Sequence, residues 1–230
     1  MNTEKHIVYE IFNALRKHEH NNDEPVTERL MRGYVKSFRG DLIRKYSKNG
    51  ININDECRQT MSLILMKTGN NTYSAKIPKT IRLDNNSGIS VLAPDVVIPV
   101  VDNEQFELSK RNPFGRKNPF CKTVHDDLTV YVPDLSACTE YGTPLYNFIQ
   151  NQTKNIALTA VFVDPSDVPG YDWENDIYPF PAEKEFELIY QILRQIFGIS
   201  EQMPKDEIQN ARADRIIYQN EYNVNGGQQE

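Results

Sequence analysis

Apolar residues at the start of the chain recur every three or four positions, which is the period of an amphipathic helix. One such helix is predicted over residues 3–19. A second is predicted to begin after Thr27, a residue type that caps helix N-termini, and its apolar positions step by four as far as Tyr46. Asn49-Gly50 is expected to end it. Both helices need a partner along one face.

Between Cys57 and Val163 the pattern changes to short extended runs separated by clusters of Asn and Gly, which is typical of β-strands joined by turns. Prolines beside several runs favour positions at the edge of a sheet. The runs are TMSLILMK, YSAKIP, TIRL, ISVLA, VVIPVV, DLTVYVP and IALTAVFV. We therefore expect a central, mostly antiparallel β subdomain.

Helical spacing returns over residues 183–197, where apolar side chains cover more than half of the predicted helix circumference. Such a helix must be covered on two sides, and Leu188 and Ile192 are expected to face the core shared with the second helix. A shorter helix is expected over 204–218, and 219–230 form a polar, extended tail.

These patterns together predict an α+β protein, in which the terminal helices pack as a small bundle beside the β subdomain. An extended arm is expected at the C-terminus. Four parts are expected. Residues 1–56 form a helical part, and residues 57–163 form a β-rich subdomain with a basic loop at 109–122. Residues 164–218 form an acidic loop and C-terminal helices that pack on the N-terminal helices, and residues 219–230 form the tail.

Composition narrows the class of protein. The 230 residues carry a net charge of −6, so the overall charge gives no indication of affinity for nucleic acid. The three cysteines form no C-x-x-C pair, which argues against a disulfide framework or a zinc site and favours a reducing compartment. No apolar stretch has the length of a membrane span and no signal peptide is recognisable, so neither secretion nor membrane insertion is expected.

Two kinds of charged segment stand out. Residues 164–176 contain no Lys or Arg, are stiffened by prolines, and include two aromatic residues, Tyr171 and Trp173. The acids of this segment are Asp164, Asp167, Asp172, Glu174 and Asp176. Opposite in sign are one face of the second helix, with Arg29, Arg32, Lys36 and Arg39, and the loop at 109–122, with Lys110, Arg111, Arg116, Lys117, Lys122 and the expected aromatic tips Phe114 and Phe120. A basic helix face is often merely solvated, whereas the aromatic loop suits contact with another protein.

Catalytic chemistry finds little support. His125-Asp126 is a pair found in metal-dependent phosphohydrolases, but it leads directly into an expected strand and has no second histidine nearby, so we interpret it as a turn. Pro94-Asp95 could open a nuclease motif, yet no acid-x-Lys occurs anywhere in the chain. Phosphate-binding and serine-nucleophile motifs are absent as well. We expect no enzyme activity, catalytic residue, metal or cofactor.

Several stretches resemble one family. FVDPSDV, YPFPAEKEFELIYQIL and MPKDEIQNARAD follow one another in the C-terminal half, and AKIPKTIRL and the basic loop before LTVYV lie upstream in the matching order. They resemble a structural protein family of crAss-like and related short-tailed bacteriophages. The resemblance implies a virion protein at the head-tail interface, assembled in the host cytoplasm, that forms a dodecameric ring of the connector and part of the conduit for DNA.

The resemblance also implies partners: copies of the chain itself, the portal protein, and adjacent connector or tail rings, with genomic DNA only as cargo and no membrane. A cyclic ring repeats one heterologous interface, so each subunit needs two complementary patches. The acidic segment and the two basic segments are a candidate pair, with Tyr171 and Trp173 as anchors. The alternative is that the acidic segment packs against its own subunit.

The tail suggests a further contact. Tyr218, Tyr222 and Val224 stand among Asn, Gln and Gly, so they are expected to become ordered on the portal or on a neighbouring ring. An acidic conduit would also let the duplex slide past, because it would not hold phosphates. Two other functions remain open: a metal-dependent phosphohydrolase or nuclease built around His125, and a monomeric host-directed phage protein.

Overall fold

A computed structural model of the chain describes residues 2–17, 26–51, 55–81, 83, 88–94, 96–112, 117–137 and 141–199. Two units are distinguished, Met1–Gln191 and Ile192–Glu230. The first contains nearly all of the secondary structure and is α+β, as predicted. The expected C-terminal arm and the helix at 204–218 lie outside the described residues.

The two N-terminal helices follow the predicted pattern closely. Helix α1 spans Glu4–Lys17 and helix α2 spans Glu28–Lys48. Thr27 caps α2 as predicted, since its hydroxyl accepts a hydrogen bond from the backbone N–H of Leu30 at 3.3 Å. The apolar side chains on one face of each helix are buried, and α1 packs against α2.

Helix α5 spans Glu185–Phe197 and begins two residues later than predicted, because Ala182–Lys184 form a short 3₁₀ turn, η5. Leu188 and Ile192 are both fully buried. The first half of α5 lies against α2: the hydroxyl of Tyr46 donates a hydrogen bond to the Glu187 carboxylate at 2.8 Å.

The strands form a seven-stranded sheet in which all named neighbours are antiparallel. The strand order is β4-β3-β7-β1-β2-β6-β5. The strands are β1 (Gln59–Gly69), β2 (Thr72–Lys76), β3 (Ser90–Ala93), β4 (Val96–Ile98), β5 (Phe120–Val124), β6 (Asp127–Tyr131) and β7 (Lys154–Ala160). The predicted strand TIRL is wrong, because Thr80 makes only an isolated bridge to Phe162.

The sheet closes on itself as a barrel. Directly after β4, the chain pairs with β5 in parallel: Cys121 donates its N–H to Pro99 O at 2.9 Å, and Val101 donates its N–H to Cys121 O at 2.8 Å. One apolar core then draws on strands from both ends of the order, including Val91 and Cys121. Closure leaves the inward side chains of every strand in a single interior.

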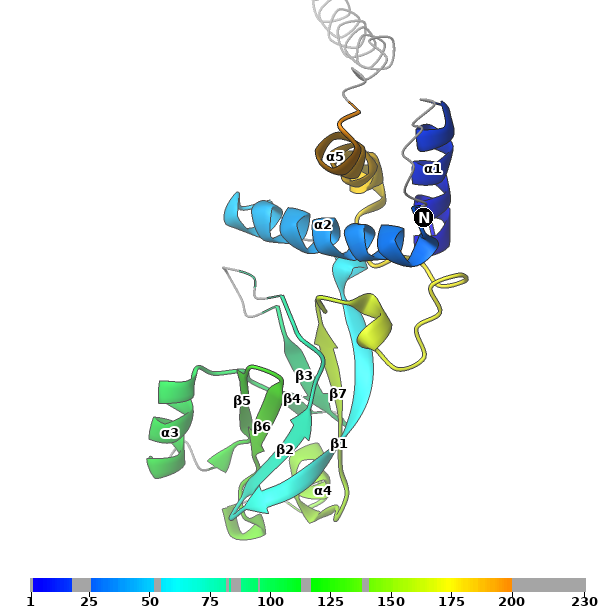
Figure 1. Cartoon of the computed structure of the whole chain (residues 1–230). Helices are drawn as coiled ribbons and strands as arrows, with labels where there is room; N and C mark the ends of the chain where they lie inside the picture. Colours follow the sequence, from blue (N-terminus) through cyan, green and yellow to red (C-terminus); the bar gives the residue numbers. More distant parts are fainter. Residues whose placement is uncertain are drawn as a thin grey trace, which may run out of the picture. The chain divides into compact units, whose positions relative to one another are not determined.

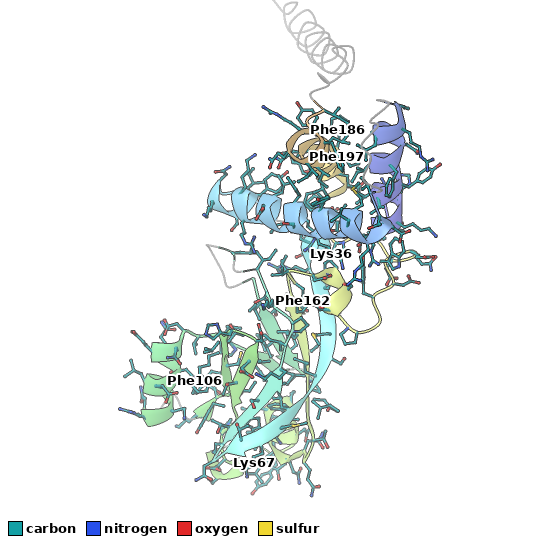
Figure 2. All side chains as sticks on the ribbon, viewed as in Figure 1. Lys36, Lys67, Phe106, Phe162, Phe186 and Phe197 are labelled. Atoms are coloured by element: carbon teal, nitrogen blue, oxygen red, sulfur yellow. The ribbon has the colours of Figure 1, made fainter. Side chains whose placement is uncertain are left out.

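Each end of the barrel is covered. The connection after β6, which the sequence did not resolve, contains a short 3₁₀ turn, η3 (Leu135–Ala137), and helix α4 (Pro144–Gln150), whose Phe148 is buried in the barrel core. Lys154, at the start of β7, is 3% exposed and donates to the carbonyls of Phe148 and Ile149 at 2.8 and 2.7 Å and to that of Asn151. Burial lowers the pKa of this ammonium. At the other end, Phe162 is fully buried below α2 (Figure 2).

Helix α3 (Asn103–Arg111) covers the outside of β5, as Figure 1 shows. Its Phe106 packs edge-on against Phe120, which stacks on Tyr131, in a cluster separate from the barrel core. The expected long loop at 109–122 is therefore too wide: Arg111 ends a helix and Phe120 begins a strand, so Phe120 is a buried packing residue and not an exposed tip.

Candidate interaction surfaces

The acidic segment begins with a residue that is bound to its own subunit. Asp164 accepts a hydrogen bond from the backbone N–H of Ser166 at 2.9 Å, which caps the 3₁₀ turn η4 (Pro165–Asp167), and it pairs with Lys36 of α2 at 2.9 Å. Partial burial alone would raise the pKa of Asp164, but hydrogen bonds from Ser166 and Lys36 hold it below its ordinary value. Figure 2 labels Lys36 on the side of α2 toward the barrel.

Replacing Asp164 with asparagine is expected to lower the free energy of unfolding at neutral pH by about 0.5–1 kcal/mol, because asparagine keeps the cap but loses the ion pair with a partly exposed lysine. A carboxyl whose folded pKa is depressed stabilises the fold above its ordinary pKa and loses that effect as the pH falls through the folded pKa. The difference between the two proteins should therefore disappear in acid. Urea unfolding from pH 7 to pH 3 measures it.

Asp167→Asn is the matched control, since Asp167 is exposed and makes no ion pair within the described part of the chain. It should leave the unfolding free energy unchanged at every pH. A loss for Asp164→Asn that persists undiminished at pH 3 would contradict the ion-pair explanation.

Trp173 is held by the two N-terminal helices of its own subunit. The guanidinium of Arg32 lies 4.2 Å from the centre of the indole ring, and the same group pairs with the buried carboxylate of Glu4 at 2.9 Å. The backbone N–H of Lys5 donates to Trp173 O, and the Lys5 ammonium pairs with Glu174 at 3.1 Å. In the isolated subunit the aromatic anchor is thus half-buried against α1 and α2.

The remaining acids are exposed. Asp172 organises a turn by accepting hydrogen bonds from Asn175 and from the backbone N–H of Glu174, and these lower its pKa. Asp167, Asp172 and Asp176 form no ion pair within the described residues. Tyr171 lies beneath them and is half-buried, and burial raises the pKa of its hydroxyl. Three carboxylates of the predicted acidic segment are therefore exposed and have no ion-pair partner among the described residues.

Arg39 lies in the interior of the subunit. Its side chain is fully buried and donates to the carbonyls of Pro179 and Phe162, both at 2.8 Å, and more weakly to that of Cys57 at 3.4 Å. These three carbonyls belong to the segments that enter and leave the barrel below α2. Arg29, by contrast, is exposed at the start of α2. The predicted basic face of α2 is thus largely used for packing within the chain.

The basic loop keeps two described cations on the surface. Arg111, at the end of α3, and Lys117 are exposed. Lys122 instead pairs with Glu107 of α3 at 3.1 Å. Five predicted contact residues lie outside the described residues: Phe114, Arg116, Tyr218, Tyr222 and Val224.

The outer side of four strands forms a surface that the charge pattern did not reveal. Across β1, β7, β3 and β4, the paired positions Ser62, Ala157, Leu92 and Val97 form one outward row. Ile64 and Asn155 form part of the next row. We call these six residues the bare sheet face. Ile64 is 66% exposed and Val97 is 69% exposed.

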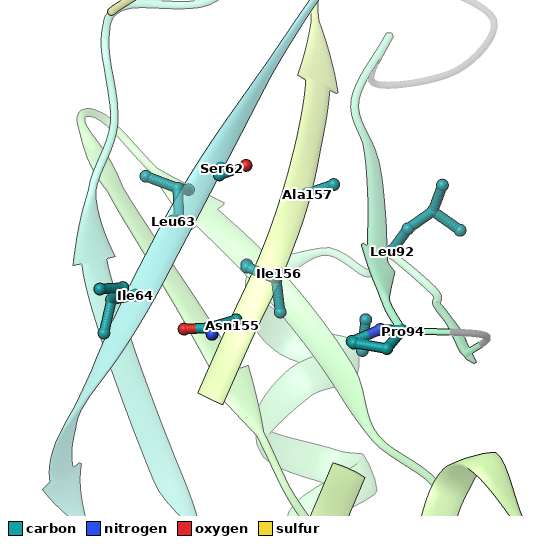
Figure 3. A pocket seen from close by; sticks show the side chains of 9 residues that line it. Ser62, Leu63, Ile64, Leu92, Pro94, Asn155, Ile156 and Ala157 are labelled. Atoms are coloured by element: carbon teal, nitrogen blue, oxygen red, sulfur yellow. The ribbon is translucent and has the colours of Figure 1, made fainter. Parts of the chain in front are cut away.

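The bare sheet face is shallowly hollowed, with a volume of about 540 Å³ (Figure 3). Small side chains, Ser62 and Ala157, make the floor, and Ile64, Leu92 and Pro94 stand around it. None of the described residues that line this hollow is charged. A sequence signal did exist: in the run MSLILM the apolar residues occupy both alternating faces of β1, so one set had to be exposed or covered by a partner.

His125 stands where the sequence analysis put it, in the two-residue turn between β5 and β6, with a positive φ of 53°. Asn and Asp are commoner than His in this left-handed region. Among the described residues, no three His, Cys, Asp or Glu side chains converge as metal ligands would. Nor does any described helix combine the length and apolarity needed to span a bilayer.

Comparison with protein families matches residues 6–215 of the chain to the family described as phage tail ring protein 2. The chain belongs to this family. The resemblance to a ring protein of crAss-like phages is thereby confirmed. No curated protein matches the chain.

As a phage tail ring protein, the chain is a structural component of the virion and associates with copies of itself. Membership of this family means that some of the exposed surfaces described above must contact other copies of the chain. A ring subunit must be internally well fixed and must also present two different patches to its neighbours.

Proposed function

We propose that this tail ring protein forms a ring of the head-to-tail connector, docks near the portal protein, and makes part of the conduit through which the genome leaves the head. The observation that carries the proposal is the family match over residues 6–215. The ring is assembled in the host cytoplasm, and twelve copies would match the symmetry of a portal. The role is structural and involves no catalysis.

Contacts that hold helix α2 in place within the subunit support this role. Arg39, Lys36 and Arg32 each tie helix α2 to the chain that surrounds the barrel entrance, through carbonyls, a carboxylate and an indole ring respectively. A subunit that forms the wall of a conduit must be rigid, because each subunit positions the next one in the ring. The negative net charge of −6 also suits a channel wall, since it does not hold DNA phosphates.

Complementary charges on neighbouring copies would fix how one subunit is oriented against the next. The exposed acids Asp167, Asp172 and Asp176 are the part of the acidic segment that a neighbour can reach, and the exposed cations Arg111 and Lys117 have the opposite sign. Phe114 and Arg116 belong to the same basic segment in the sequence. Complementary charge of this kind guides encounter and orientation more than it adds affinity.

Cryo-electron microscopy of the intact phage particle tests the proposal. The expected result is a ring of copies of this chain between the head and the tail, coaxial with the portal. Location of the chain in another part of the virion, or its absence from particles, would overturn the connector assignment.

The tail supports docking by a separate contact. Deletion of residues 220–230 is expected to reduce incorporation of the chain into particles at least about tenfold, because the Tyr222 and Val224 side chains are lost from a docking surface. The thermal unfolding of the purified subunit should not change. Quantitative immunoblotting of purified particles, with circular dichroism of the free chain, measures both.

A shorter deletion, of residues 228–230 alone, removes no aromatic or aliphatic side chain and is the control. It should leave incorporation at the level of the unmodified chain. Full incorporation after the longer deletion would rule out docking by this segment.

A further inference from the structure

We propose that the contact between ring subunits has an apolar centre, which is the bare sheet face of one copy covered by the α3 side of the next copy. The acidic segment at the end of this face meets Arg111 and Lys117 of the same neighbour. The inference deepens the proposed function and rests on its self-assembly into a ring.

The bare sheet face has the character of an interface centre. Its exposed aliphatic residues are Ile64, Leu92 and Val97, and the described residues that line the hollow beside Ile64 and Leu92 carry no charge. The central parts of interfaces are depleted of charge and rich in large apolar side chains. Elsewhere on the barrel, α3 covers the outside of β5, and α4 covers one end. On the bare sheet face, by contrast, Ile64, Leu92 and Val97 are exposed.

The two halves of the proposed contact lie on different parts of the barrel wall. In the order β4-β3-β7-β1-β2-β6-β5, the bare sheet face takes the first four strands and α3 packs on the last, which closure places beside the chain that follows β4. Figure 1 shows α3 beyond β5, on the side away from β1 and β7. Two different patches of one subunit join head to tail, as a closed ring requires. Leu108, 67% exposed on α3, offers an apolar side chain to the hollow.

Charge supports the same pairing. The acidic segment continues directly from the bare sheet face: β7 leads into it, and Gln59 of β1 donates its side-chain N–H to Pro165 O at 3.4 Å. Asp167 is exposed there. On the α3 side, Arg111 at the end of α3 and Lys117 before β5 are exposed. A head-to-tail contact thus sets an acidic edge against a basic one, with an uncharged centre.

The area of the bare sheet face is also consistent with the centre of an interface. Four strands spaced about 4.8 Å apart, with about 3.3 Å per residue along β7, give a face of roughly 15 by 20 Å. This is smaller than the ~800 Å² per partner of a standard interface, so the charged rim must supply the remainder. Monomers rarely leave contiguous apolar patches larger than a few hundred Å² uncovered, and patches near this size are often functional.

Cross-linking in assembled particles tests the inference. The chain carries Ile64→Cys, on β1, together with Leu108→Cys, and Cys138→Ser removes the one cysteine outside the described residues. Burial raises the pKa of Cys57 to about 11 and that of Cys121 to about 12, so neither thiol should react at neutral pH. A short bismaleimide should give a ladder of dimers, trimers and larger products. Either cysteine alone should give none.

Charge substitution gives an independent measurement. Val97→Glu should reduce incorporation into particles at least about tenfold, since it places an unpaired carboxylate beside the aliphatic side chains of the contact. Tyr9→Glu, at a residue 59% exposed on α1, is the matched control and should incorporate normally. Thermal unfolding of each purified chain shows whether the fold is intact, and both changes should leave it so.

The outcomes separate this inference from the proposed function. Normal incorporation of Val97→Glu, or no ladder from particles that contain the double-cysteine chain in normal amount, would overturn the inference and leave the ring intact. Dimers without higher products would mean an isologous contact and would also overturn it. Absence of the unmodified chain from particles would instead refute the proposed function itself.

Discussion

Replacement of Arg39 by methionine is expected to lower the free energy of unfolding of the subunit by about 3–5 kcal/mol. Methionine keeps most of the apolar stem, but the buried carbonyls of Pro179 and Phe162 each lose a charged donor at 2.8 Å, and Cys57 O loses a weaker one. Water does not reach these groups, because the site is fully buried. Urea unfolding followed by circular dichroism measures the change.

Two further variants make the result specific. Arg39→Lys keeps the charge but not the planar fork of donors, so it should recover only part of the loss. Arg44→Met breaks an exposed pair with Asp41 on the same helix and should cost about 0.5 kcal/mol or less. If Arg39→Met unfolds within about 1 kcal/mol of the unmodified chain, Arg39 does not hold α2 to the barrel entrance in the way described.

Lys154→Met should have the second largest effect, a loss of about 2–4 kcal/mol in the free energy of unfolding. The Lys154 ammonium donates to three carbonyls at the end of α4, including Phe148 O at 2.8 Å, and these would be left without it. Because α4 closes one end of the barrel, its release should also expose Phe148. Urea unfolding measures the stability, and proteolysis within α4 measures its release.

Lys76→Met is the control for a surface lysine. Its ammonium pairs with Asp127 at 2.9 Å but is largely exposed, so the loss should be about 0.5 kcal/mol or less. Equal stability of Lys154→Met and Lys76→Met, with no faster cleavage in α4, would show that the buried ammonium does not secure this end of the barrel.

The sequence was sufficient for features that depend on local periodicity. Helices α1 and α2 follow from apolar spacing and from the cap at Thr27, and the alternating pattern of β1 and β7 places them as strands. Such features are set by residues within a few positions of one another. The α+β class follows from them.

Short elements were harder to predict because their stability comes from packing. Helices α3 and α4 have nine and seven residues, too few for a clear apolar period. Their caps were present in the sequence, Asp102 before α3 and Thr143-Pro144 before α4. Closure of the barrel depends on contact between Val101 and Cys121, which no local pattern encodes.

The contacts of the charged residues could not be predicted from the sequence. Composition and spacing identified oppositely charged segments, but not whether each charge is paired inside the subunit or outside it. Lys36 and Arg32 turn out to face Asp164 and Trp173 of the same chain. Whether Asp167, Asp172 and Asp176 meet another copy stays a prediction. Pairing of this kind depends on tertiary proximity, which a single sequence does not contain.

The pairing of Pro99–Val101 with β5 has a consequence for a protein that associates with copies of itself. Without it, β4 and β5 would each present a row of unsatisfied backbone groups to which the strand of another molecule could add. With it, those groups are occupied inside the subunit. Subunits can then crowd together during virion morphogenesis without recruiting one another into fibrils, and only side chains are left to decide which surfaces adhere.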